Sequence, residues 1–305
     1  MGFTRRDFIQ SSIAAATLAS LGTGARAESD GMIMRTIPSS GEKIPIIGLG
    51  TNRYGVDRSE SARAPLKAAL ERFNELGGTV IDTAPMYRTS ESVLGDLIAD
   101  LDIRSELFVA TKADKDPGGA ATVSQMGASL KKLRTDSIDL MQVHNLRGWK
   151  KALAAMREWK KEGVVRHIGI TTSRSSQYEE FEQIMRSEEL DFIQINYSIE
   201  QRQAADRILP LAGDKGIAVM INRAFGGGRI FKTVGDQPLP EWAKEFDAGS
   251  WAQFLLKYAL SHPAATVAIP GMTKERHVED NIAAGKGRMP TAELRREQEA
   301  FFDRL

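Results

Sequence analysis

The sequence GTVIDTAPMYRTSESVLG, residues 78–95, contains the end of a strand, a loop and the start of a helix. A short apolar run predicts a buried strand that ends at Asp82. Pro85 excludes a helix from the loop that follows, and Tyr87 lies in that loop. On its own, an aspartate followed by a tyrosine is better explained by a turn cap and a packed ring. The C-terminal edge of a parallel sheet is, however, where α/β folds place their chemistry.

The alternation of apolar strands and amphipathic helices continues along the chain. We expect a hairpin near residues 39–41. Strands are expected at 44–50, 79–82, 107–112, 137–144, 165–171, 191–196, 217–222 and 266–270. Helices are expected at 62–76, 91–101, 123–133, 151–162, 177–186, 204–212, 251–260, 275–284 and 291–302. Eight strand–helix repeats over about 250–280 residues predict a closed (β/α)₈ TIM barrel in a single domain. A doubly wound sheet is disfavoured, since Gly48, Gly50 and Gly55 lack the G-x-G-x-x-G spacing.

The composition excludes several classes of function. Hydrophobic residues make up 42% of the 305 residues and charged residues 27%, which is typical of a globular domain. A net charge of +1 gives no reason to expect nucleic acid or an anionic membrane as a partner. The absence of cysteine excludes disulfides, thiolate catalysis and zinc–cysteine sites, and the histidines lack metal-ligand spacing.

The N-terminus has the three regions of a secretory signal peptide. Arg5 and Arg6 precede an apolar segment at residues 13–21, which is too short to span a bilayer. Residues 25–27 then form a small-x-small cleavage site. An amphipathic N-terminal helix is the alternative, but it explains neither the arginine pair nor the cleavage site. The arginine pair resembles the twin-arginine motif, which directs the export of folded proteins. We therefore expect export to the periplasm by the twin-arginine machinery, with no stable membrane anchor after cleavage. The predicted domains are the signal peptide at 1–27 and the barrel at 28–305.

Two more polar residues end the strands that follow Asp82. Lys112 comes thirty residues after Asp82, and His144 comes thirty-two residues after Lys112. Because each gap is one strand–helix unit, the three side chains are expected side by side at one rim, with Tyr87 over them. A structural ion pair beside a satisfied histidine would explain the aspartate and the lysine. It would not explain a tyrosine next to a lysine.

Asp82, Tyr87, Lys112 and His144 together are suited to donating a proton to a substrate. A phenol with a pKa of about 10 is a poor acid at neutral pH. A nearby ammonium favours the phenolate, so we expect Lys112 to lower the pKa of Tyr87. Asp82 would hold Lys112, and His144 would orient a substrate oxygen. Such a group can protonate a carbonyl oxygen during reduction, provided that a hydride source is bound.

The sequence resembles the aldo-keto reductases over nearly its whole mature length. The motifs that carry the resemblance are GLGT at 48–51, DTAxxY at 82–87, SExxLG at 90–95, ATK at 110–112, DLxxxH at 139–144, RHIGI at 166–170, IPG at 269–271 and DN at 280–281. The resemblance implies a (β/α)₈ barrel that uses a nicotinamide dinucleotide to reduce a small carbonyl substrate. The cofactor expected is NADP(H), with NAD(H) not excluded. The catalytic tetrad carries over to Asp82, Tyr87, Lys112 and His144, with Tyr87 as the acid.

The resemblance also implies the residues that bind the cofactor. They are Gly50, Thr51, Asp82, Thr171, Thr172, Gln194, Asn222, Arg223, Phe225, Gly271, Met272, Lys274, Arg276, Asp280 and Asn281. Two threonines stand where the family often has a serine–asparagine pair, beside the nicotinamide carboxamide. Asn222 stands where a tyrosine commonly stacks on the nicotinamide. Lys274 and Arg276, in a helix N-terminus suited to phosphate, either meet a 2′-phosphate or are ordinary solvated charges.

Two classes of function remain open at this level. One is a carbonyl reductase or alcohol dehydrogenase, which the intact tetrad favours. The other is an exported cofactor-binding or redox-sensing barrel with little turnover. Asn222 and export to a compartment without a free nicotinamide pool favour the second class. The sequence does not identify the substrate, because specificity depends on the shapes of the loops.

Overall fold

The computed structural model describes residues 31–114 and 119–305. The predicted signal peptide and its cleavage site lie outside the described residues, as do the four residues between β5 and α3. Within the described residues, no helix is both long and apolar enough to cross a membrane.

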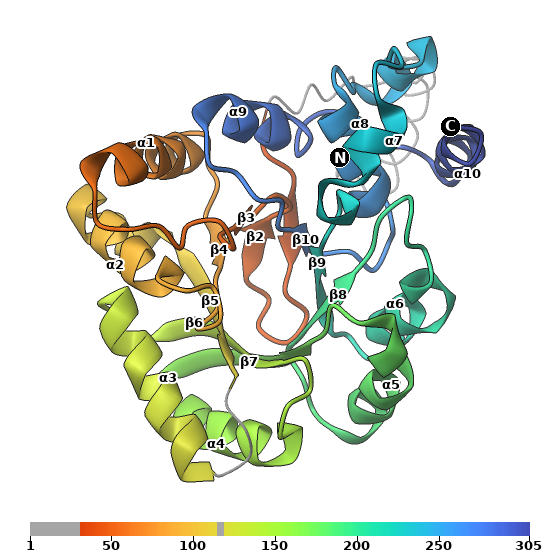
Figure 1. Ribbon diagram of the computed structural model, residues 1–305. Coiled ribbons are helices and arrows are strands. Elements are labelled where there is room, and N and C mark those ends of the chain that lie inside the picture. The colour runs from red at the N-terminus through yellow and green to blue at the C-terminus, as the bar shows by residue number, and fades with distance from the viewer. Residues whose placement is uncertain (1–30, 115–118) are drawn as a thin grey trace, which may run out of the picture.

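Eight parallel strands form the centre of the molecule (Figure 1). They are β3 (Leu49–Gly50), β4 (Val80–Asp82), β5 (Phe108–Ala113), β6 (Ile138–His144), β7 (Val165–Thr171), β8 (Phe192–Asn196), β9 (Ala218–Asn222) and β10 (Val267–Ala268). Each strand pairs with the next in chain order. Parallel bridges from Ile47 to Ala268 and from Gly50 to Gly271 join the first strand to the last. A Cβ atom on Gly50 would lie 2.6 Å from the carbonyl oxygen of Ile269, so this approach requires glycine. The predicted (β/α)₈ fold is confirmed.

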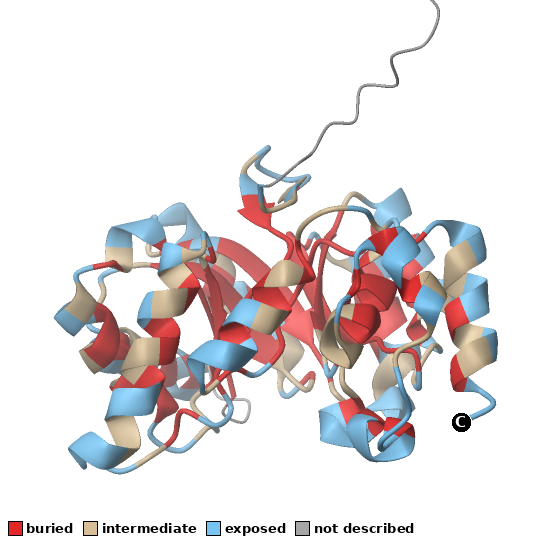
Figure 2. Ribbon diagram, turned by 90° about the horizontal axis from the view of Figure 1, so that it is seen from above, coloured by how far each residue is buried: buried red, intermediate tan, exposed pale blue. Residues whose placement is uncertain are grey.

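Helices surround the strands on the outside of the barrel (Figure 1). They are α1 (Glu60–Glu75), α2 (Ser90–Leu101), α3 (Gly119–Leu133), α4 (Trp149–Lys161), α5 (Tyr178–Ser187), α6 (Ala204–Asp214), α8 (Trp251–Leu260) and α9 (Glu275–Ala283). Their buried faces point to the strands and their exposed faces to solvent (Figure 2). The SExxLG motif has a packing role here. Gly95 of α2 lies against α3 so closely that a Cβ atom would sit 2.1 Å from the carbonyl oxygen of Lys132.

The expected single strand at 44–50 is wrong, because it is split into two elements. Lys43–Pro45 is β2, which pairs antiparallel with β1 (Met34–Thr36) in a hairpin outside the barrel. Beyond a last backbone hydrogen bond from Ile46 to Ile33, the chain leaves the hairpin and enters the barrel at β3. Ile37 and Ile44 of the hairpin are buried in one cluster with Val80, Phe108 and other residues of the barrel interior. The hairpin thus closes the N-terminal end of the barrel and leaves the C-terminal end accessible.

The loop expected between β9 and α8 contains short helices. They are a 3₁₀ turn at Gly226–Gly228, α7 (Ile230–Val234) and a 3₁₀ helix at Glu241–Phe246. The last helix, α10 (Ala292–Phe302), packs beside α8 through contacts of Trp242 and Trp251 with the ring of Phe301. This aromatic packing anchors the segment that follows β9 at the C-terminal end of the barrel.

Candidate active site

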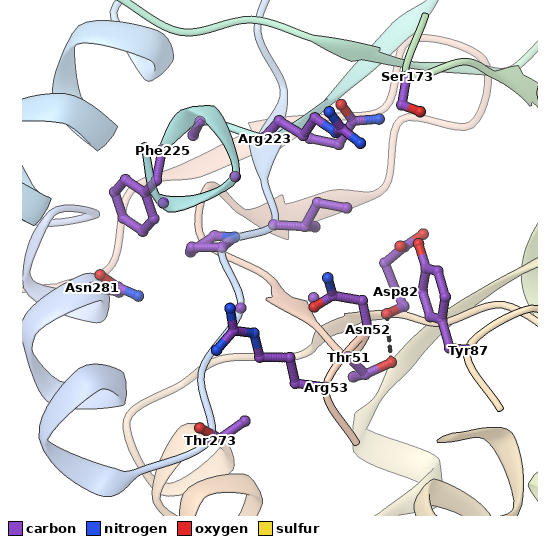
Figure 3. A pocket seen from close by; sticks show the side chains of 18 of the residues that line it. Thr51, Asn52, Arg53, Asp82, Tyr87, Ser173, Arg223, Phe225, Thr273 and Asn281 are labelled. Atoms are coloured by element: carbon purple, nitrogen blue, oxygen red, sulfur yellow. Dashed lines mark hydrogen bonds between the residues drawn. The ribbon is translucent and has the colours of Figure 1, made fainter. Parts of the chain in front are cut away.

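A cavity of about 730 Å³ opens at the C-terminal ends of the strands. Asp82, Tyr87 and His144 lie in its wall at one end. Thr273 and Asn281, from the segments after β10, lie at the other end (Figure 3). The cavity is therefore elongated and crosses the top of the barrel from β4 to α9.

The deepest part of the tetrad is an ion pair between Asp82 and Lys112. The Lys112 ammonium lies 2.8 and 2.7 Å from the two carboxylate oxygens of Asp82, and it also donates to the carbonyl oxygen of Thr83 at 2.7 Å. Only 1% of Lys112 is exposed. Burial alone would lower the pKa of Lys112, but the Asp82 carboxylate and the Tyr87 hydroxyl more than offset burial and raise this pKa. The lysine therefore stays charged.

Tyr87 lies between this ion pair and the cavity. The Lys112 ammonium is 5.2 Å from the centre of its ring. The ring of His144 stands at right angles to that of Tyr87, with centres 6.4 Å apart. The structure thus brings together the four residues predicted from the ends of β4, β5 and β6. Their catalytic roles remain proposals.

The predicted direction of the Tyr87 pKa is wrong. The Lys112 ammonium lowers the pKa of Tyr87, as expected, and is the largest single influence. Burial of the phenol and the negative charge of Asp82 together outweigh it, so the pKa of Tyr87 is raised above its ordinary value. The expectation counted the lysine without the carboxylate that neutralises it. In this arrangement Tyr87 keeps its proton at neutral pH, and the lysine acts on the phenolate only once the proton leaves.

Asp82 is also the centre of a hydrogen-bond network. Gln194 donates to its Oδ1 at 2.8 Å, and Thr171 donates to Gln194 at 2.9 Å. The hydroxyl of Thr51 donates to the backbone carbonyl of Asp82 at 2.9 Å (Figure 3). Two residues predicted to bind the cofactor, Gln194 and Thr51, therefore bond directly to the tetrad, and Thr171 connects to it through Gln194.

Asn222 lies in the cavity wall beside Gln194. Its Oδ1 is buried and has no hydrogen-bond partner among the described residues, while its Nδ2 makes only 3.5 Å contacts. Thr172 differs from Thr171. The Thr172 hydroxyl donates to Oε1 of Gln177 at 2.6 Å and accepts a hydrogen bond from the backbone N–H of Arg174. Thr172 does not border the cavity.

The segment after β9 forms one side of the cavity. Arg223, with a backbone φ of 51°, and Phe225 border it together with Gly227 and Gly228. Phe225 packs against Phe231 with ring centres 5.0 Å apart. Arg223 and Arg53 lie between the two ends of the cavity (Figure 3), and within the described parts of the chain neither has a carboxylate partner.

The segment after β10 forms the far end. Gly271, Thr273 and His277 border the cavity, whereas Lys274 and Arg276 are exposed and lie outside its wall. Partial burial lowers the pKa of His277, and the charges of Arg276 and Lys274 lower it further. Met272 is buried, and its carbonyl oxygen accepts a hydrogen bond from Tyr54 at 3.0 Å.

Asp280 and Asn281, in the second half of α9, also line the cavity. Asp280 accepts hydrogen bonds from Ser250 at 2.7 Å and from Gln253 at 2.8 Å. The side-chain amide of Asn281 borders the cavity, and no described residue bonds to it. The Asn222 Oδ1 atom and the Asn281 amide lie at opposite ends of the cavity without a hydrogen-bond partner in the described chain, and Arg53 and Arg223 lie between them. This arrangement fits an elongated anionic ligand with polar ends, such as a nicotinamide dinucleotide.

Several residues of the site were not predicted from the sequence. The additional side chains in the wall include Asn52, Arg53, Asn145, Ser173, Phe231 and Thr273. Most of them lie in loops, whose paths the strand pattern does not determine, and Phe231 lies on the short helix α7. Asp114 could have been found, because it follows Lys112 by two residues and side chains two apart in a strand point to the same face. It lies beside His144.

A model of the Aldo/keto reductase family matches residues 46–300. The chain belongs to this family. It is 28% identical over 270 residues to methylglyoxal reductase YeaE of Escherichia coli, covering 86% of this chain and 93% of the relative. It is 25% identical to glyoxal reductase of Bacillus subtilis, over 79% of this chain and 83% of that protein. An aldo-keto reductase from Klebsiella pneumoniae in complex with NADPH superposes with a TM-score of 0.74 at 27% identity, covering 90% and 95% of the two chains.

Proposed function

We propose that this aldo-keto reductase uses NADP(H) to reduce small aldehydes or ketones to alcohols, with Tyr87 as the proton donor. The observation that carries the proposal is the buried Asp82–Lys112 pair beneath Tyr87, at one end of a cavity long enough for a dinucleotide. The family membership supports NADP-dependent carbonyl reduction independently of this geometry.

Each residue of the tetrad has a separate role in the proposed proton transfer. A bound nicotinamide cofactor supplies the hydride. Tyr87, whose raised pKa keeps its proton in place, donates that proton to the carbonyl oxygen. The Lys112 ammonium then stabilises the phenolate that remains, and Asp82 keeps Lys112 charged and oriented. His144 borders the cavity next to Tyr87 and is placed to contact the same oxygen.

The walls of the cavity suggest how NADP(H) is held. We assign the carboxamide to the end formed by Thr171, Gln194 and Asn222, and the adenosine to the end formed by Asp280 and Asn281. The charges of Arg53 and Arg223 lie between these ends, where a pyrophosphate would lie. Lys274 and Arg276 remain our candidates for the 2′-phosphate, since they lie on the first turn of α9 and at its N-terminus.

The relatives suggest small 2-oxoaldehydes such as methylglyoxal as the first substrates to test. The test is steady-state reduction of methylglyoxal, glyoxal and simple aldehydes with NADPH and with NADH. NADPH-dependent turnover of at least one carbonyl supports the proposal. NADPH binding without turnover of any of them would instead favour the low-turnover, cofactor-binding alternative.

We also propose that the protein is exported folded, with cofactor already bound, to the periplasm. The support is the pair Arg5 and Arg6, the apolar segment and the small-x-small site at 25–27. Wild type should appear in the periplasmic fraction with a mature N-terminus at Glu28, and Arg5→Lys/Arg6→Lys should remain in the cytoplasm. Equal amounts of both proteins in the periplasm would exclude the twin-arginine pathway.

A further inference from the structure

Asp114 contacts the tetrad histidine from the side away from the cavity. Its Oδ1 lies 3.1 Å from Nδ1 of His144. This nitrogen is buried and has no hydrogen bond of good angular geometry to any described group. Because Nδ1 is buried and the His144 ring borders the cavity, we infer that Nε2 is the nitrogen that faces it. The carboxylate and the cavity therefore contact opposite nitrogens of one imidazole.

Asp114 is itself held in place. Its side chain is 3% exposed, and its backbone N–H donates to Oε1 of Gln125 at 2.9 Å. Gln125 in turn donates to the carbonyl oxygen of Lys112 at 3.3 Å. Among the described residues, the other charged group on the carboxylate is Arg147, whose guanidinium is 3.5 Å from Oδ1 and whose side chain is 45% exposed. Lys112, Asp114 and His144 thus belong to one connected unit.

We propose that Asp114 is a positioning residue that fixes a proton on Nδ1 of His144 and balances the charge when the ring also carries a proton on Nε2. A carboxylate next to a ring nitrogen favours the tautomer that donates to it. In the neutral ring of that tautomer, Nε2 can only accept a hydrogen bond. In this tautomer His144 donates to a carbonyl oxygen only when Nε2 also carries a proton, and the Asp114 carboxylate then faces the ring from 3.1 Å.

This inference rests on the proposed carbonyl reduction for its kinetic consequence but not for its structural one. As negative charge develops on the substrate oxygen, a charged donor at Nε2 supplements the proton from Tyr87. The proton on Nδ1 and the ring orientation exist whether or not any substrate is turned over. The two claims can therefore fail separately.

The structural claim is tested by nuclear magnetic resonance of the protein labelled with ¹⁵N-histidine. The chain has four histidines, so His144→Gln assigns the His144 signals. In the wild type with NADPH added, Nδ1 should carry a proton, alone or together with Nε2. In Asp114→Asn, the proton should move wholly or partly to Nε2. A wild-type proton only on Nε2, or identical spectra in wild type and Asp114→Asn, would overturn the proposal.

The kinetic claim is tested by a double-mutant cycle on an activated aldehyde. Asp114→Asn should lower kcat/KM by about 10- to 100-fold, the scale of a lost hydrogen bond to a charged group. The dissociation constant of NADPH should stay unchanged. In the His144→Gln background the same change should cost less than about 2-fold, because Asp114 acts through His144. An equal loss in both backgrounds would make the role of Asp114 merely structural and overturn the proposal.

Arg147→Gln is the matched control, because it removes the other partner of the same carboxylate oxygen. This half-exposed ion pair should contribute little, so the loss in kcat/KM should be at most about 5-fold. A loss as large as that of Asp114→Asn would assign the effect to the loop ion pair instead of His144. If the wild type reduces no carbonyl at all, the proposed function fails, and the resonance experiment still decides whether Asp114 fixes the ring.

Discussion

The two ends of the cavity are built differently. At the tetrad end, Asp82 and Lys112 are at most 2% exposed, end adjacent strands and bond directly to each other. At the adenosine end, Lys274 and Arg276 are exposed, and no described residue forms an ion pair with either. The strands of the barrel therefore hold the tetrad end, and replacing either Asp82 or Lys112 leaves the other as a buried, unpaired charge. The adenosine end depends on loops, which can change without disturbing the strands.

The largest effect should come from Tyr87→Phe, which removes one hydroxyl at the tetrad end. Carbonyl reduction should fall by on the order of 10²–10⁴-fold, the usual scale of general acid catalysis. The fold and NADPH binding should survive, since the Tyr87 hydroxyl donates no hydrogen bond to another described residue. Reduction of an activated aldehyde and fluorescence titration with NADPH measure the two quantities.

The pH dependence provides a second check on the same residue. The protonated phenol is the active form, and a pKa raised above the ordinary 10 keeps Tyr87 protonated across neutral and mildly alkaline pH. The rate of carbonyl reduction by the wild type should therefore not decline through ionisation of Tyr87 below about pH 10. Wild-type turnover in Tyr87→Phe with normal NADPH binding would show that the tetrad is not the active site.

Lys112→Met should affect both activity and stability. Reduction should fall in the same direction, and the double variant with Tyr87→Phe should lose far less than the product of the two single losses. Removing one partner of a buried pair also destabilises a fold by about 3–5 kcal/mol. Urea unfolding measures this loss, and adding Asp82→Asn to Lys112→Met should restore part of it.

The raised pKa of Lys112 determines the pH range in which the Asp82–Lys112 pair stabilises the fold. The stability that the pair contributes is fully present below the unfolded lysine pKa of about 10.4, and it is lost as pH rises through the higher folded value. The difference between wild type and Lys112→Met should thus be the same at pH 7 and pH 9. A difference that disappears by pH 9 would mean that Lys112 is not held charged by Asp82.

The contrast between the two ends also explains what the sequence could predict. Apolar runs locate strands, and residues at their ends share one rim, so the strand pattern alone placed Asp82, Lys112 and His144 together. Helix and strand periodicity does not give the path of a loop. The family resemblance named Thr172 and Met272 as cofactor residues, and in the structure their side chains lie outside the cavity wall. The split of residues 44–50 was missed because a hairpin strand and a barrel strand have the same apolar pattern.

A smaller effect is expected from Arg276→Ala at the adenosine end. Loss of one charge-assisted hydrogen bond to a 2′-phosphate should weaken NADPH binding by about 10-fold, the lower end of the usual range, because the side chain is exposed. NADH binding should change little. Arg296→Ala on α10 is a control that removes the same charge from another exposed helix position. Equal wild-type affinities for NADPH and NADH, or equal losses for both in Arg276→Ala, would exclude Arg276 as the phosphate ligand.

The smallest effect should be a gain, from Asn222→Tyr. Asn222 ends β9 at the tetrad side of the cavity. The sequence resemblance implies a tyrosine stacked on the nicotinamide at this position. Its Oδ1 has no partner within the described chain and its other contacts are 3.5 Å long, so replacing it removes little. A stacked ring is worth about 0.5–1.5 kcal/mol, so NADPH should bind about 2- to 10-fold more tightly.

Asn222→Ala, which removes the amide without adding a ring, should not bind more tightly than wild type. Fluorescence titration of the three proteins distinguishes the outcomes. Weaker binding by Asn222→Tyr would show that the asparagine itself contacts the cofactor, and that this end of the cavity tolerates change as poorly as the tetrad does.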